Sequence, residues 1–358
     1  MAGSTNSYVG RMDHGIEIFA QSRIALEQMN GHLTCKELSS DLEIPLHEIY
    51  ELVAALDDAN LLDTEIAKIS VHTRFHSANA NRASHSTDDR NDAAHQQLLT
   101  KLVPELAYAT WQEGVRDGGV GLLGARRNVT ITIFGSSRIA VLLYGILLAS
   151  GFSSTNIHIR DARNISDNDV SAGFLRSSDI GISIRERLQE LSRELSLFPL
   201  TSRPKSASIA SESQSHDGQD INRTIAIAVG EVPADQIQEW MSRGIPHLII
   251  ENPDGPSLTM GPLVIPGYSP CLRCIAMSKE EIHGRWKEIA WHRIGVLPDE
   301  VPVSVAHHIS GLAALEILRF VDEGKSELIG ASVRMDYRDP RGSERRLFTR
   351  HPACGCNW

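Results

Sequence analysis

The chain has 358 residues, of which 41% are hydrophobic and 5% aromatic, with 35 Lys and Arg against 45 Asp and Glu. This apolar content is enough for buried cores and excludes a wholly disordered chain. A formal net charge of -10 argues against general binding to phosphate backbones, and five cysteines in this length exclude a disulfide scaffold. At about 100–200 residues per domain, the length predicts two or three domains.

Residues 1–75 predict a small α+β domain of winged-helix type. The apolar residues from Ile16 to Met29 are expected to form its first helix. Thr34-Cys-Lys-Glu37 is a capping box, which predicts the start of a short second helix. Pro45 fits the first turn of a third helix, whose apolar stripe runs from Leu46 to Leu56.

The charges of this domain argue against DNA binding, the familiar role of a winged helix. The alternating segment at 66–75 resembles the β wing of that fold, but residues 1–75 contain five cationic side chains against twelve carboxylates. A helix that enters the major groove needs cationic or amide side chains near the phosphates. A DNA-binding regulator and a structural cap or dimerisation module both stay open as alternatives.

Two polar stretches predict how the chain is divided. Residues 76–97 are expected to be a linker, and residues 98–358 a second domain. Within that domain, residues 201–223 contain six serines and predict a mobile insertion, because strand-like sequence resumes directly after them. Neither stretch can bury enough apolar surface to offset the entropy of ordering.

The second domain has the pattern of an α/β sheet. Residues 128–161 predict a strand, a glycine turn, an apolar helix and a second strand that ends at Asp161. Further strands are expected at 224–229 and 247–250, with a helix between them at 234–243. This alternation predicts a doubly wound, mainly parallel, Rossmann-like sheet.

The turn after the first of these strands is a candidate nucleotide site. A Gly-x-Gly-x-x-Gly turn lets bare backbone approach a pyrophosphate at a helix N-terminus, but only the first glycine is present in Gly135-Ser-Ser-Arg-Ile-Ala140. Arg138 can bind an anion there or occupy the site itself. Asp161 stands where an acidic residue would meet a ribose hydroxyl. The candidate cofactor contacts are therefore Gly135, Ser137, Arg138 and Asp161.

Four of the five cysteines form two close pairs, Cys271 with Cys274 and Cys354 with Cys356. Four thiolates on two tight turns suit a closed tetrahedral zinc site, which leaves no position for water and is therefore structural. Two redox pairs or one disulfide are the alternatives, and His351 is a candidate substitute ligand. Cys35 stands alone and is expected to be a small buried or half-buried residue.

The order of these motifs resembles the ThiF-like, ubiquitin-activating-type adenylyltransferase superfamily. Further matches are S-D-I-G at 178–181 and G-P-L-V-I-P-G at 261–267. Within it, the chain is most similar to actinobacterial leader-peptide-binding partners of azoline-forming cyclodehydratases, in which a winged helix precedes a ThiF-like domain that often ends in H-P-x-C-G-C, seen here at 351–356. The resemblance implies a peptide substrate, captured by adding a strand to an exposed edge, and a separate modifying enzyme. It also implies a homodimer.

Active members of that superfamily adenylate a C-terminal carboxylate with ATP and Mg²⁺. Counted from the shared S-D-[IV]-G, their Asn-Arg pair falls here on Val170 and Ser171, and their lysine falls on Ile182. Where their magnesium aspartate is expected, this chain has Gly230-Glu231. Because phosphoryl chemistry needs such cations and a metal-holding carboxylate, we expect a degenerate protein with no catalytic residues. An ATP-dependent adenylyltransferase that uses Arg163 or Arg176 instead stays as the alternative.

The sequence favours a cytoplasmic protein without a membrane span. The N-terminal residues contain no apolar core of signal-peptide length. The uncharged stretch at 139–157 is better explained as a buried helix and strand than as a span, because it directly follows a strand and a turn.

Overall fold

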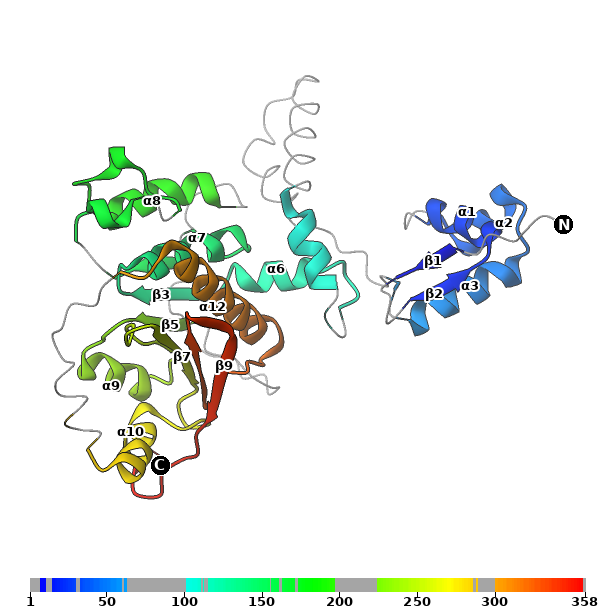
Figure 1. Cartoon of the computed structure of the whole chain (residues 1–358). Coiled ribbons are helices and arrows are strands. Elements are labelled where there is room, and N and C mark those ends of the chain that lie inside the picture. The colour runs from blue at the N-terminus through cyan, green and yellow to red at the C-terminus, as the bar shows by residue number, and fades with distance from the viewer. Residues whose placement is uncertain are drawn as a thin grey trace, which may run out of the picture. The chain divides into compact units, whose positions relative to one another are not determined.

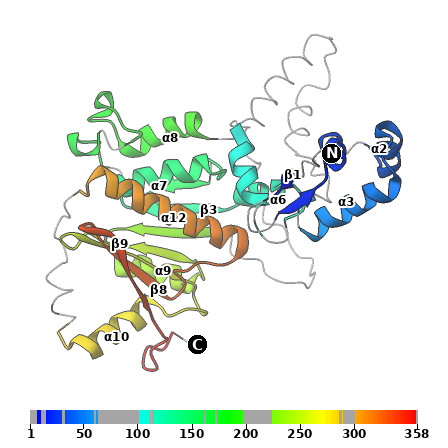
Figure 2. The same ribbon diagram turned by 45° about the vertical axis from the view of Figure 1, so that its right-hand side comes forward.

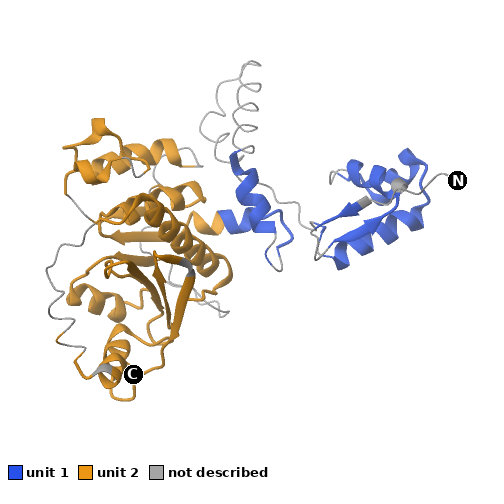
Figure 3. Ribbon diagram, in the orientation of Figure 1, with its two compact units in different colours: residues 1–123 blue, residues 124–358 orange. Residues whose placement is uncertain are grey.

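The computed structural model describes residues 7–10, 15–29, 33–59, 61–62, 101–110, 112, 115–154, 156–160, 163–170, 173–196, 224–285, 288 and 300–356. The chain divides into two compact units, residues 1–123 and 124–358 (Figure 3). The predicted wing at 66–75, the linker at 76–97, the insertion at 201–223 and Asp161 lie outside the described residues. The domain limits expected from the sequence therefore stay predictions.

Unit 1 begins with a two-stranded antiparallel ribbon followed by three helices (Figure 1). The strands are β1 (Ser7–Val9) and β2 (Ile16–Ile18), and the helices are α1 (Ala20–Gln28), α2 (Cys35–Leu42) and α3 (Leu46–Asp58). Their shared core contains Ile18, Ala25, Ile49, Leu52 and Leu56. A helix over 101–110 and the start of α6 (Val120–Arg126) complete the described part of this unit.

The predicted helices of unit 1 are present, with one correction at the first. Ile16 to Ile18 form a strand, because Glu17 is exposed between half-buried Ile16 and buried Ile18, which is the two-residue period of a strand. The capping box at α2 is confirmed: the Glu37 amide donates to Thr34 Oγ1 at 3.3 Å, and the Thr34 amide donates to Glu37 Oε2 at 2.7 Å. Pro45 is the N-cap of α3.

Unit 2 is built on a seven-stranded mixed sheet (Figures 1 and 2). In spatial order its strands are β4 (Ile157–Ile159), β3 (Thr130–Phe134), β5 (Thr224–Val229), β6 (His247–Ile250), β7 (Ser257–Val264), β8 (Ala331–Asp336) and β9 (Asp339–Leu347). The first four are parallel, and β7, β8 and β9 join antiparallel. The sheet is thus mixed rather than mainly parallel. The short β6–β7 and β8–β9 connections leave no room for the crossover that two of these pairs would need to be parallel.

Helices cover both faces of the sheet, as expected for a doubly wound fold. Along β5, Ile225 and Ile227 belong to the main core with α7 (Arg138–Ala149), α8 (Ile184–Leu195) and α12 (Val303–Glu323). The alternate residues of β5, Ala226 and Ala228, pack instead with Trp240 of α9 (Ala234–Ser242). Figure 2 shows α7 and α12 side by side, in agreement with their extensive contact.

The uncharged stretch at 139–157 is part of this core. Nine residues of α7 are buried, and the chain then turns and enters β4. Among the described residues, no helix combines the length and apolarity needed to cross a bilayer. A helix that is apolar all round belongs in the interior of an α/β unit of this size.

Candidate functional site

The carboxyl ends of the parallel strands meet at one edge of the sheet, where α/β proteins bind ligands. Gly135 follows β3 at this edge with φ 108°, and a Cβ there would lie 2.2 Å from the carbonyl oxygen of Val229 at the end of β5. Only glycine fits, because the neighbouring strand approaches so closely. Packing alone therefore explains the single glycine that remains in this turn.

The next residue of the turn, Ser136, is held by Arg163. The Arg163 guanidinium donates to Ser136 Oγ and to the Ser136 carbonyl, each at 2.6 Å. Its two terminal nitrogens also donate to the Asp169 carboxylate, each at 2.6 Å. The Asp169 side chain is 2% exposed and accepts two further bonds from the amide and hydroxyl of Ser166, both 2.8 Å. Burial would raise the pKa of Asp169, but the bonds from Arg163 and Ser166 outweigh it and lower that pKa.

The start of α7 is held by Arg138 and Glu300. The Arg138 amide donates to Glu300 Oε2 at 3.3 Å, and its guanidinium donates to the carbonyls of Asn168 at 2.7 Å and Val301 at 3.1 Å. Ser137 is the N-cap of α7 without a side-chain cap bond, and its buried Oγ has no partner among the described residues. Three of the four candidate cofactor contacts thus lie together at this turn, and Asp161, the fourth, lies outside the described residues.

The S-D-I-G motif holds the structure that follows β4. Asp179, in the 3-10 helix η2 (Ser177–Asp179), accepts from the Arg176 amide at 2.8 Å and pairs with Arg187 of α8 at 2.9 Å. Of the positions where the resemblance leads us to expect polar residues in an active enzyme, Val170 packs against the apolar core and Ile182 is 38% exposed. Ser171 lies outside the described residues.

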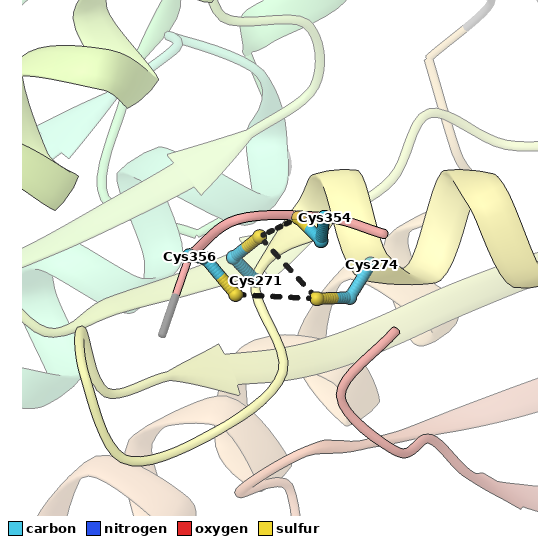
Figure 4. A group of neighbouring side chains, drawn as sticks. All are labelled: Cys271, Cys274, Cys354 and Cys356. Atoms are coloured by element: carbon cyan, nitrogen blue, oxygen red, sulfur yellow. Dashed lines mark hydrogen bonds between the residues drawn. The ribbon is translucent and has the colours of Figure 1, made fainter. Parts of the chain in front are cut away.

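The two cysteine pairs meet at the other end of unit 2 (Figure 4). Their four sulfurs lie within 4.8 Å of one another, with 3.7 Å between Cys271 and Cys274, 3.5 Å between Cys271 and Cys354, and 3.3 Å between Cys274 and Cys356. Tetrahedral Zn–S bonds of about 2.3 Å would set sulfurs about 3.8 Å apart. A disulfide needs about 2.05 Å, and all four cysteines are free thiols.

Local structure explains how each pair presents two sulfurs. Cys271 is the N-cap of α10 (Leu272–His283), and Cys274 lies in its first turn, where the helix dipole favours thiolates. Gly355 adopts φ 75° between Cys354 and Cys356, which lets so short a turn direct both sulfurs to one point. The cluster can therefore hold a metal ion such as zinc with no coordination position left for water.

The thiols of the cluster differ in how readily they ionise. Burial opposes ionisation of Cys274, but bonds from the His351 backbone and from the thiols of Cys356 and Cys354 lower its pKa to about 7. Burial and the neighbouring thiols raise the pKa values of Cys354 and Cys356. Binding of a metal to all four sulfurs would therefore release protons.

His351 supports the cluster from outside. Its Nδ1 accepts from the Ala353 amide at 3.2 Å, so its Nε2 carries the proton and donates to Glu281 of α10 at 2.9 Å. Both ring nitrogens are thus engaged, and His351 is not the substitute ligand considered from the sequence. It ties the turn that carries Cys354 to α10. Cys35 lies apart, half-buried in the core of unit 1.

Solved structures of other proteins are similar to this architecture. No family model and no curated protein sequence matches the chain. Among solved structures, Escherichia coli MccB with succinimide is 14% identical over 98% of this chain and 94% of its own, with a TM-score of 0.56. MccB with ATP is 13% identical over 99% and 95%, and PaaA is 14% identical over 96% and 99%, each with a TM-score of 0.56.

These likenesses define the fold. The chain has a ThiF-like α/β fold, of the kind found in MccB. MccB has also been solved with MccA, including a complex with N-formylated MccA in which it is described as the microcin C7 biosynthetic enzyme.

Proposed function

We propose that this chain is a zinc-containing, catalytically degenerate ThiF-like protein that binds a peptide or small protein and presents it to a separate modifying enzyme. The observation that carries the proposal is the turn after β3, which the chain fills with its own Arg163–Asp169 pair. An ATP polyphosphate would have to displace that pair.

The charges at the turn support the same conclusion. Transfer of a phosphoryl or adenylyl group needs cations that neutralise developing charge, and a carboxylate that holds Mg²⁺. Arg163, the candidate substitute cation, forms a bidentate pair with buried Asp169, and Arg138 is bonded to two main-chain carbonyls. Arg176 contributes its amide to Asp179. The guanidinium groups of Arg163 and Arg138 therefore support the fold, whereas the Arg176 side chain is exposed.

A peptide site is best accommodated on unit 1. The β1–β2 ribbon has two strands, so a peptide strand can pair with an outer edge, as in β-augmentation. Large apolar side chains are exposed on or beside it, including Tyr8 at 53% and Phe19 at 68%. The excess of carboxylates over cations in residues 1–75 favours a cationic peptide. The structures of MccB with MccA add support from the shared fold.

The proposal is tested by three experiments on the full chain. In titration calorimetry with ATP and Mg²⁺ we expect no binding, and in an ATP–pyrophosphate exchange assay no exchange. Fluorescence anisotropy with a labelled cationic leader peptide should show binding that weakens as salt is raised, because screening reduces the attraction of the acidic unit. Phe19→Asp should weaken this binding at least tenfold, whereas Leu315→Asp, an equally drastic change on α12 of unit 2, should not.

The main alternative is an ATP-dependent adenylyltransferase, favoured by the fold shared with MccB, which has been solved with ATP. Pyrophosphate exchange that depends on the peptide and is lost in Asp161→Ala would establish that alternative and contradict degeneracy. Retention on heparin or duplex DNA at moderate salt would support a DNA-binding regulator instead. A cyclodehydratase and a short precursor peptide encoded beside the chain would favour the azoline pathway.

A further inference from the structure

Glu300 lies where a helix N-terminus would receive an anion. Its Oε2 accepts the Arg138 amide at 3.3 Å, which places a carboxylate against the positive end of the twelve-residue helix α7. The next residue, Val301, accepts from the Arg138 guanidinium at 3.1 Å. Glu300 and Val301 lie just before Pro302, the N-cap of α12, so both contacts hold the start of that helix against the turn.

We propose that Glu300 is an internal substitute for a phosphate group and closes a latent oxyanion site formed by the start of α7 with Arg138 and Arg163. The proposal rests on the proposed function, because it explains why a nucleotide-binding fold would not bind a nucleotide. It adds a specific device: one carboxylate, brought in from a segment 162 residues away in the chain, keeps the site occupied.

The local charges explain why this carboxylate matters. Two carboxylates, Glu300 and Asp169, face two guanidinium groups, Arg138 and Arg163, so the cluster is neutral when all four are ionised. An incoming polyphosphate would meet both carboxylates at close range. With Glu300 neutral, the cluster has one net positive charge beside the helix N-terminus, which favours an oxyanion.

Two further observations agree with an oxyanion site that is present at the start of α7 but occupied by Glu300. Burial, and then the nearby Asp169, raise the pKa of Glu300, so the ionised form of its carboxyl is disfavoured at this position. Ser137 Oγ is buried at the same helix start and has no partner among the described residues, so a polar ligand would find a hydrogen-bonding group there. The Asn168 carbonyl accepts from the Arg138 guanidinium at 2.7 Å and so helps to hold Arg138 at this site.

The test compares the wild-type protein with Glu300→Gln, which keeps the shape and removes the charge. Titration calorimetry and thermal shift are run with inorganic pyrophosphate and with ATP. Glu323→Gln, the same change at the other end of α12, is the matched control. We expect Glu300→Gln to bind pyrophosphate at least tenfold more tightly than the wild type and the control. Adding Arg138→Gln to that variant should remove the gain. Circular dichroism, with Glu300→Ala as a second variant, checks that the fold is retained.

The possible results separate the two proposals. If Glu300→Gln and Glu300→Ala are folded and bind pyrophosphate no better than the wild type, the closing role of Glu300 is refuted. The proposed function of a degenerate, peptide-binding protein is then unaffected. If the wild type binds ATP as tightly as Glu300→Gln, Glu300 does not block the oxyanion site, and its closing role is again refuted. ATP–pyrophosphate exchange by the wild type would overturn the proposed function itself.

Discussion

Cys274 and Cys35 each lie in the first turn of a helix, α10 and α2 respectively, but only Cys274 has other thiols within reach. Cys274→Ser should therefore remove one of four metal ligands and lower zinc affinity by more than the roughly 10–100-fold that is typical for loss of an outer-shell partner. Since structural zinc contributes directly to folding, the melting temperature should fall as well. Metal content is measured with a chromophoric chelator after dialysis, and melting by circular dichroism.

Cys35→Ser is the matched control for this prediction. It makes the same chemical change, also in the first turn of a helix, and should retain one zinc per chain. Equal zinc loss in both variants would contradict the four-cysteine site. So would a Cys274→Ser protein that keeps its full metal content and its melting temperature.

Single residues differ in how far the sequence could predict them. The cysteine cluster was predictable because each pair is close in the chain and thiolates have few other roles in such spacing. The Arg163–Asp169 pair and Glu300 were not, since arginines and carboxylates are common on any surface and Glu300 reaches Arg138 only through the tertiary fold. Arg138 was singled out from the sequence, but the carbonyls that hold it come from distant segments.

At the scale of elements, one fully buried ion pair connects α6, α7 and α12. Arg126 donates to Asp322 at 2.9 and 2.5 Å and to the carbonyl of Ser150 at 2.9 Å, and both charged side chains are 0% exposed. Asp322→Asn would leave the guanidinium buried without its counter-charge, which typically costs about 3–5 kcal/mol. We therefore expect a large drop in the free energy of unfolding, measured by urea denaturation.

Two variants show whether this cost arises from the unpaired charge. Arg126→Met combined with Asp322→Leu removes both charges and should recover much of the lost stability. Arg243→Ala breaks the exposed pair with Glu239 on α9 and should leave the urea midpoint unchanged. A double variant no more stable than Asp322→Asn would indicate that packing, not charge, is responsible.

Helices and strands whose apolar residues recur with a clear period were predictable from the sequence, and those without such a period were not. The strands at 224–229 and 247–250 have the limits expected, and the helix expected at 234–243 is present as α9. Strand β7 gives no alternating signal because seven of its eight residues are buried. The ribbon in unit 1 has three-residue strands, which are too short for periodicity to separate from a helix start.

For the whole molecule, two histidines with lowered pKa values predict how stability depends on pH. Burial lowers the pKa values of His247 and His158 in the folded protein. His247 Nδ1 donates to the Ile245 carbonyl at 2.9 Å, and its buried Nε2 has no partner in the described part of the chain. An unfolded histidine has a pKa of about 6.5. Below this value, and down to the folded pKa, the unfolded chain binds more protons than the folded one.

The free energy of unfolding should therefore fall as the pH is lowered through this window, by at most about 1.4 kcal/mol per pH unit for each histidine. Above about pH 7 these groups should contribute no slope. Glu300 acts in the opposite sense, because its pKa is raised, but only at pH values around and above its usual range near 4.5. Loss of zinc from protonated thiols adds to acid destabilisation, so the informative quantity is a difference between variants.

His247→Phe isolates the histidine contribution, because phenylalanine preserves the ring contact with Trp240, now 5.3 Å between centroids, and cannot bind a proton. Urea denaturation of zinc-loaded protein between pH 5.5 and 8 should give a shallower pH dependence for His247→Phe than for the wild type. His308→Gln, on an exposed position of α12, should leave the wild-type slope intact. If both variants keep that slope, protonation of His247 does not limit the stability of unit 2, and its burial between β6 and α9 has a packing role alone.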